Sequence, residues 1–188
     1  MRLVSLILLA VLSGALSGCF PVVAIGMGAG VVMSQDRRTG GAFVEDEGIE
    51  LKALDRIAKQ YPANVHAIVT SFNRNVLISG EVPSEAVKSE IGKLVYGIEN
   101  VRNVNNELVI AGMSSVTQRS SDSLITSDVK LRFLKDHRFS AEHIKVVTES
   151  GTVFLMGIVK RAEAAASTEI ASTTGGVMRV IKLFEYLD

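Results

Sequence analysis

The sequence has a single cysteine, no tryptophan and no excess of charge of either sign. One cysteine excludes an intramolecular disulfide, and no group of histidines and cysteines has the spacing of a metal site. The 20 basic residues balance the 20 acidic ones, so no overall charge favours nucleic acid, and we expect no nucleic-acid partner. The 188 residues suffice for one domain of ordinary size or for two small ones.

Side chains suited to catalysis are also scarce, since the chain has only three histidines. Neither His66 nor His143 has a serine, cysteine or carboxylate partner at a recognisable catalytic spacing. The acidic run at residues 45–47 could bind a cation, but capping of a helix start explains it more simply. The sequence GMGAG at residues 26–30 has no strand before it and no helix after it, which argues against a nucleotide-binding loop. We therefore expect no catalytic residues, no metal, no cofactor and no enzymatic activity.

The first 19 residues have the form of a secretory signal. Arg2 carries a positive charge and is followed by an apolar stretch that is too short to span a membrane. Residues 16–19, Leu-Ser-Gly-Cys, resemble the bacterial lipobox, in which the cysteine is lipidated and becomes the new N-terminus. Because Cys19 is the only cysteine, we favour lipidation over an ordinary signal peptide or an uncleaved anchor with a stray thiol.

A lipidated Cys19 would hold the chain at a membrane. At about 0.8 kcal/mol per buried methylene, one acyl chain holds only marginally, whereas several hold durably. Lipoproteins of this class carry three chains. Phe20 stands where an Asp would resemble an inner-membrane retention signal, so the resemblance implies an anchor in the outer membrane, facing the periplasm. Residues 20–45, first apolar and rich in glycine and then polar, are expected to form a tether.

From Asp46 onward the hydrophobic pattern alternates between helical and strand-like spacing. Residues 46–61 have helical spacing, with Ile49, Ala53, Leu54 and Ile57 on the expected buried stripe. Two strands joined by a turn at residues 72–75 follow, then a helix capped by Ser84, then a third strand. The predicted order of elements is α-β-β-α-β over residues 46–112.

The same unit recurs in the second half of the chain. Gly157 lies 77 positions after Gly80, and His143 lies 77 positions after His66. Random sequence does not keep such a register over five elements. The sequence therefore predicts an α+β protein with two tandem units, at 46–112 and 122–188, joined by a linker at 113–121. Each unit is expected to pack a three-stranded mixed sheet on two helices.

A glycine inside a strand is unusual because it contributes no side chain to packing. Gly80 and Gly157 occupy the same place in the second strand of each unit, on the face that the helices must cover. We expect each glycine to let a helix approach the sheet closely, and the alternative is the close approach of a ligand.

The strand pattern V-x-[IL]-x-G-x-V occurs as VLISGEV at 76–82 and as VFLMGIV at 153–159. Each copy is followed by a helix and by a final strand with the pattern V-x-x-V, which resembles the BON domain. Two such units behind a lipobox resemble the DolP-like family of dual BON-domain outer-membrane lipoproteins, over roughly residues 34–188. This resemblance implies a non-enzymatic protein that binds anionic phospholipid, phosphatidylglycerol or cardiolipin, through its second domain. It also implies a role in outer-membrane integrity and recruitment to the division site.

The sheet faces turned away from the helices differ between the two units. In the first unit this face has Leu77, Ser79 and Glu81, a mixed set that tolerates solvent. In the second unit it is apolar, and a patch of that size is unusual on a soluble monomer. We expect the first domain or the linker to cover it, with a partner protein or a second protomer as alternatives. The predicted domain-docking face consists of Phe154, Met156, Ile158, Ile181 and Leu183.

The first helix of the second unit, expected over 122–138, has a second apolar face besides its core stripe. Apolar side chains ringed by Lys and Arg suit a helix that lies in an anionic lipid interface, although nearby aspartates weaken the basic patch. The alternatives are an ordinary solvated helix and a docking surface for an envelope-assembly protein. The predicted lipid-binding residues are Leu124, Leu131, Lys130, Lys135 and Arg138.

Overall fold

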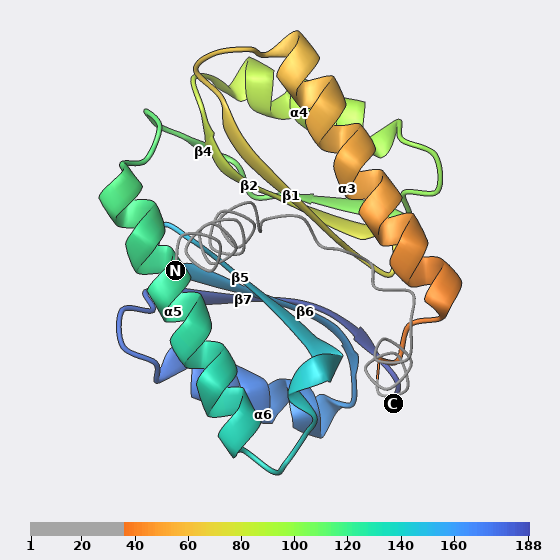
Figure 1. Cartoon of the computed structure of the whole chain (residues 1–188), viewed down its shortest axis with the longest axis vertical. Coiled ribbons are helices and arrows are strands. Elements are labelled where there is room, and N and C mark those ends of the chain that lie inside the picture. The colour runs from red at the N-terminus through yellow and green to blue at the C-terminus, as the bar shows by residue number, and fades with distance from the viewer. Residues whose placement is uncertain (1–35) are drawn as a thin grey trace, which may run out of the picture. The chain divides into compact units, whose positions relative to one another are not determined.

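The computed structural model describes residues 36–188. Its elements follow the predicted order α-β-β-α-β in each half, except that the last strand of the first half is divided in two, and the helices of each unit lie on one side of that unit's sheet (Figure 1). The predicted α+β class with two tandem units is confirmed. The expected signal, Cys19 and the tether up to residue 35 lie outside the described residues.

The first unit consists of α3 (Gly40–Gln60), β1 (His66–Phe72), β2 (Asn75–Val82), α4 (Glu85–Tyr96), β3 (Asn103–Asn106) and β4 (Val109–Ile110). β1 and β2 are antiparallel, and the two turn residues between them, Asn73 and Arg74, have positive φ. Turns with two such residues follow the natural twist of a hairpin, and this one lies where the sequence predicted a turn. β3 and β4 pair parallel with successive parts of β2, so the expected third strand is broken in two.

The second unit consists of α5 (Val116–Lys135), the short 3₁₀ helix η2 (Ala141–His143), β5 (Ile144–Glu149), β6 (Thr152–Val159), α6 (Arg161–Ser172) and β7 (Arg179–Tyr186). β5 and β6 form an antiparallel hairpin, and β7 pairs parallel with β6 along its whole length. The third strand is therefore continuous in this unit.

The first helix of each unit begins six residues earlier than the sequence predicts. The Thr39 side chain accepts a hydrogen bond from the Ala42 backbone and starts α3, so residues 40–45 are helical rather than tether. Ser115 does the same for Gln118, so residues 116–121 belong to α5 rather than to a linker. α5 also ends at Lys135, before the predicted end at residue 138.

Each unit has its own apolar core between its helices and its sheet. The stripe of α3 reaches the first core through Ile49, Ala53 and Ile57. Leu54 is 41% exposed, so its predicted place on that stripe is wrong, because it lies about 100° around the helix from Ala53.

A buried aspartate on the first helix of each unit holds the hairpin turn. The Asp46 carboxylate accepts hydrogen bonds from the backbone N–H groups of Asn73 and Arg74, at 2.8 and 2.7 Å. Asp122, 76 positions later, accepts from the two turn residues of the second hairpin at 3.0 and 2.9 Å. The expectation that the acidic run at 45–47 caps a helix start is wrong, because Asp46 lies in the second turn of α3.

The strand glycines permit a close approach of the backbone at the start of the first strand, not of a helix packed on the sheet. A Cβ atom on Gly80 would lie 2.0 Å from the carbonyl oxygen of His66 in β1. On Gly157 it would lie 2.4 Å from the carbonyl oxygen of His143. The prediction of helix approach is therefore wrong, since the backbone leading into the first strand already fills that space in both units.

The outer faces of the two sheets contact each other. Phe72 and Leu77 of the first unit form a buried apolar cluster with Phe154 and Met156 of the second. The first unit therefore lies against the predicted domain-docking face, whose other members, Ile158, Ile181 and Leu183, pack around this cluster. Ser79 and Glu81, the polar members of the mixed face of the first unit, are 1% and 3% exposed beneath the same contact, so this face is covered as well.

Hydrogen bonds surround this apolar contact. Lys145 Nζ donates to Glu50 Oε1 at 2.9 Å, and the Glu185 carboxylate accepts from Asn73 and Asn75 at 2.9 and 2.6 Å. Before α3, the Arg37 guanidinium donates two hydrogen bonds to the Glu163 carboxylate of α6, at 2.6 and 2.8 Å. These pairs fix the register in which the two sheets meet.

Candidate functional site

The outward face of α5 carries exposed leucines. Leu124 is 72% exposed and Leu131 is 54% exposed, whereas Ile125, Val129 and Phe133 on the opposite side are buried in the core. Seven residues are nearly two helical turns, so Leu131 lies about 20° from the line of Leu124. Lys135 is exposed and lies on the other side of that line at a similar angle.

A third leucine, which the sequence analysis missed, extends this surface. Leu134 is 65% exposed and lies three positions after Leu131, within about 60° around the helix. The three-residue spacing between Leu131 and Leu134 could have identified Leu134 in the sequence. It was missed because Leu134 lies away from the line along the helix that joins Leu124 and Leu131, which are seven residues apart. We refer to Leu124, Leu131, Leu134 and Lys135 as the leucine face.

Two of the five predicted lipid-binding residues do not lie on the leucine face. Lys130 is exposed and lies about 120° around the helix from Leu124 but about 40° from Leu134, at the edge of the leucine face and beside a cavity that Arg38 and Glu50 also line. Arg138 follows the end of α5 and hydrogen-bonds the carboxylates of Asp136 and Glu169. These contacts raise the pKa of Arg138 and offset its charge, so it is the weakest of the five candidates.

The three aspartates near this surface differ in whether their charge is free to oppose that of Lys135. Asp122 is buried and accepts hydrogen bonds from the backbone of the hairpin turn, and Asp136 accepts hydrogen bonds from Arg138. Asp128 is exposed and lies within about 40° of Leu124, so it is the acidic group that opposes Lys135.

Among the helices of residues 36–188, none combines the length and the apolar character that crossing a membrane requires.

The model of the BON domain family matches residues 45–112 and 121–188, which together are most of the chain. The chain belongs to the BON domain family. We call the two matched regions BON1 and BON2. The outer membrane lipoprotein DolP of Haemophilus influenzae is 39% identical to this chain over 185 residues, covering 96% of both chains. The 21 kDa hemolysin of Actinobacillus pleuropneumoniae is 33% identical over 81% of this chain and 79% of its own. Osmotically-inducible protein Y of Escherichia coli is 29% identical over 81% and 78%.

These matches confirm the expected DolP-like protein with two BON domains and its place as an outer-membrane lipoprotein. Lipidation of Cys19 itself stays a prediction, since Cys19 lies outside the described residues. None of the three relatives' names is that of an enzyme.

Exposed leucines alone do not distinguish the first helix of BON2 from that of BON1. The helix α3, which begins before BON1 and continues into it, has exposed leucines too. Leu51 is 68% exposed, comparable with the leucines of α5. Its helical neighbours four positions away on either side are the acidic Glu47 and Asp55. Leu131 instead has Lys135 four positions after it. Leu124 of α5 has the acidic Asp128 at the same spacing, so the difference between the two helices is the lysine beside Leu131, which the exposed leucines of α3 lack at this spacing.

Proposed function

We propose that this lipoprotein is a non-enzymatic module that binds anionic phospholipid, phosphatidylglycerol or cardiolipin, through the leucine face of BON2. An acylated Cys19 would anchor it to the outer membrane, facing the periplasm, and BON1 would position BON2. In the cell this binding would support outer-membrane integrity and recruit the protein to the anionic-lipid-rich division site.

One observation carries the proposal: three exposed leucines lie on the side of α5 turned away from its core stripe, and Lys135 lies on that side too. Full burial of a leucine side chain contributes about 1.5–3 kcal/mol, and shallow insertion gives part of that for each of the three. A lysine near an anionic surface adds about 1 kcal/mol, and salt screens it. Lys130 can join from the flank, since its long apolar stem lets the ammonium group reach a phosphate.

The acyl anchor makes a weak contact of this kind sufficient. A chain already held at the membrane presents α5 to lipid at a high effective concentration. The leucine face then determines how BON2 lies on the membrane and which headgroups surround it.

Vesicle binding of residues 20–188, without acylation, separates the domain's own affinity from that of the anchor. We expect this chain to sediment with phosphatidylglycerol or cardiolipin vesicles, to stay free of phosphatidylcholine vesicles, and to release as salt rises. A double variant, Leu124→Glu with Lys135→Glu, should bind at least about 10-fold more weakly, because it removes apolar area and reverses a charge. Unchanged binding of that variant would show that α5 is not the lipid-binding element.

A protein of the envelope-assembly machinery is the alternative partner. Because BON1 covers the apolar sheet face of BON2, the leucine face is where such a partner would dock. A photo-crosslinker at position 131 in living cells separates the two occupants. Lipid adducts support the proposal, and a single dominant protein adduct contradicts it.

A further inference from the structure

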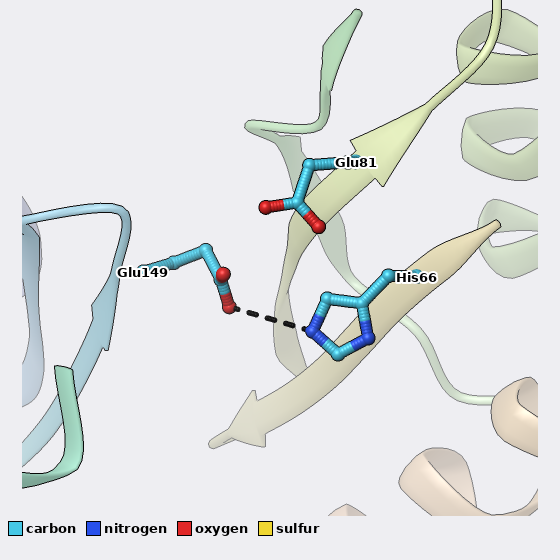
Figure 2. Close-up of side chains that lie close together, drawn as sticks. All are labelled: His66, Glu81 and Glu149. Carbon is cyan, nitrogen blue, oxygen red and sulfur yellow. Dashed lines mark ion pairs between the residues drawn. The ribbon is translucent and has the colours of Figure 1, made fainter. Parts of the chain in front are cut away.

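Three side chains that could bind a metal ion converge where BON1 meets BON2. His66 comes from β1, Glu81 from β2, and Glu149 from the last position of β5 (Figure 2). Figure 2 shows the two carboxylates and the imidazole pointing toward one another. One ligand atom from each residue lies within 4.8 Å of the other two.

The fold explains why these groups meet. His66 and Glu81 are directly opposite each other in the antiparallel register of β1 and β2. Glu149 reaches them only because the outer sheet faces of the two domains are in contact. The cluster therefore exists only in the docked arrangement of the two BON domains.

One polar atom of each of the three residues is buried without a hydrogen bond. Glu81 is 3% exposed and Glu149 is 6% exposed. Within residues 36–188, no hydrogen-bond partner reaches Glu81 Oε2, Glu149 Oε1 or His66 Nε2. The shortest ion-pair distance, from His66 Nε2 to Glu149 Oε2, is 4.0 Å, which is too long for a hydrogen bond. Buried carboxylates in this state are costly unless a cation or proton compensates them.

The neighbouring acidic groups increase the cost of burying a charged Glu149. Burial raises the pKa of Glu149 to about 7, and the nearby charges of Glu81 and Asp122 add to the effect, while Arg119 opposes it. Independently of this pKa, three ligand atoms with lone pairs converge beside two buried carboxyl groups, which is an arrangement that a divalent cation stabilises.

We propose that His66, Glu81 and Glu149 bind one divalent metal ion of the zinc type and thereby clamp BON1 to BON2. An imidazole nitrogen with two carboxylates is a donor set that zinc accepts, whereas calcium and magnesium prefer oxygen ligands alone. Small side-chain rotations bring the ligand atoms to about 2.0–2.2 Å from the ion, and water completes the tetrahedron. The His66 side chain is 20% exposed, which gives the ion a path from solvent.

The sequence repeat does not provide a second site of this kind. The positions 77 residues from Glu81 and Glu149 are Ile158 and Phe72, which cannot bind a metal. His143, the counterpart of His66, lies 4.0 Å from Glu163, which Arg37 already pairs. We therefore expect one ion per chain.

Calorimetric titration of the full chain, purified in detergent and stripped with a chelator, tests the proposal with ZnCl₂. We expect one zinc per chain, and at 100 times the dissociation constant a rise in Tm of about 5–10 °C. Magnesium and calcium should give no comparable rise. No zinc-dependent rise, or an equal rise with magnesium, would overturn the proposal.

Two isosteric variants, Glu149→Gln and Glu81→Gln, test the ligands. Each should bind zinc at least about 10-fold more weakly. Without metal, Glu149→Gln should have a Tm equal to or above that of the wild type, because the substitution removes a buried charge. With zinc, the wild type should have the higher Tm. His137→Gln removes an exposed histidine outside the cluster and should keep full zinc affinity. Wild-type affinity in both Glu variants, or its loss in His137→Gln, would place zinc elsewhere.

Discussion

His66 and His143 occupy the same place in the two BON domains, yet they face different surroundings. His66 lies among buried carboxylates at the contact between the domains, whereas His143 lies beside Glu163, which is paired with Arg37. The third strand differs as well, being broken into β3 and β4 in BON1 and continuous as β7 in BON2. The features within each domain are kept, including the buried aspartate on the first helix and the strand glycine.

The difference indicates that the duplicated fold has kept its interior and changed its surfaces. The outer sheet face of BON2 is apolar and meets the mixed face of BON1, so the two copies form one docked pair. The outward face of α5 has a lysine four positions after Leu131, whereas α3 has an aspartate four positions after Leu51. Residues that are the same at equivalent positions of the two domains thus build the fold. Residues that differ at equivalent positions lie where the domains dock and where we place binding.

The largest expected effect lies at the contact between the sheets. Phe154→Ala should lower the free energy of unfolding by about 3–5 kcal/mol and Leu77→Ala by about 2–5 kcal/mol, since both side chains are fully buried in one cluster. Because they share that cluster, the double variant should cost less than the sum of the two. Urea denaturation measures all three. Leu54→Ala, at a partly exposed site, is the control and should change stability by about 0.5 kcal/mol. Strict additivity of Phe154→Ala and Leu77→Ala would contradict the docking.

The strand glycines offer a second comparison of the domains. Gly80→Ala should cost at least about 2 kcal/mol, because its Cβ would meet the His66 carbonyl and its φ of 120° is strained for alanine. Gly157→Ala meets a similar contact without a left-handed φ and should cost about 1 kcal/mol less. Thermal unfolding ranks the two variants. Gly48→Ala, in an open helical position, should stabilise by about 0.5–1 kcal/mol. Equal stability of Gly80→Ala and wild type would refute the strand-approach explanation.

These results also show what the sequence could and could not predict. The repeat register predicted both units and the hairpin turn, because buried positions and turn residues are set by local periodicity. The start of α5 could have been found, since Ser115 and Gln118 have the spacing of a capping box, whereas Thr39 at the start of α3 has no such partner. The cluster of His66, Glu81 and Glu149 could not, because two of its members come from one hairpin and the third depends on how the domains dock.

Acid should affect the ion pair between Arg37, which precedes α3, and Glu163 of BON2. A hydrogen bond from Arg37 lowers the pKa of Glu163 to about 2, despite burial, with smaller help from the Lys160 backbone and the charge of His143. Since this is below the ordinary value of 4.5, the folded chain binds fewer protons than the unfolded chain between these values. The stabilisation is complete above pH 4.5 and lost as pH falls toward 2.

Glu163→Gln should therefore be less stable than wild type by on the order of 1–3 kcal/mol near neutral pH. The gap should close as pH falls toward 2, which denaturant titrations at several pH values can follow. Glu169→Gln, a mostly exposed partner of Arg138, is the matched control and should differ little from wild type. A gap for Glu163→Gln that stays constant down to pH 2 would show that this ion pair is not responsible.

The most direct test of the central claim compares equivalent leucines on α5 and α3. Residues 20–188 contain no cysteine, so a single cysteine introduced by Leu131→Cys or Leu51→Cys can carry an environment-sensitive fluorophore. With phosphatidylglycerol vesicles, the label at position 131 should shift to the blue as it enters lipid, while the label at position 51 stays in water. A blue shift at position 51 with none at position 131 would contradict the assignment of lipid binding to BON2.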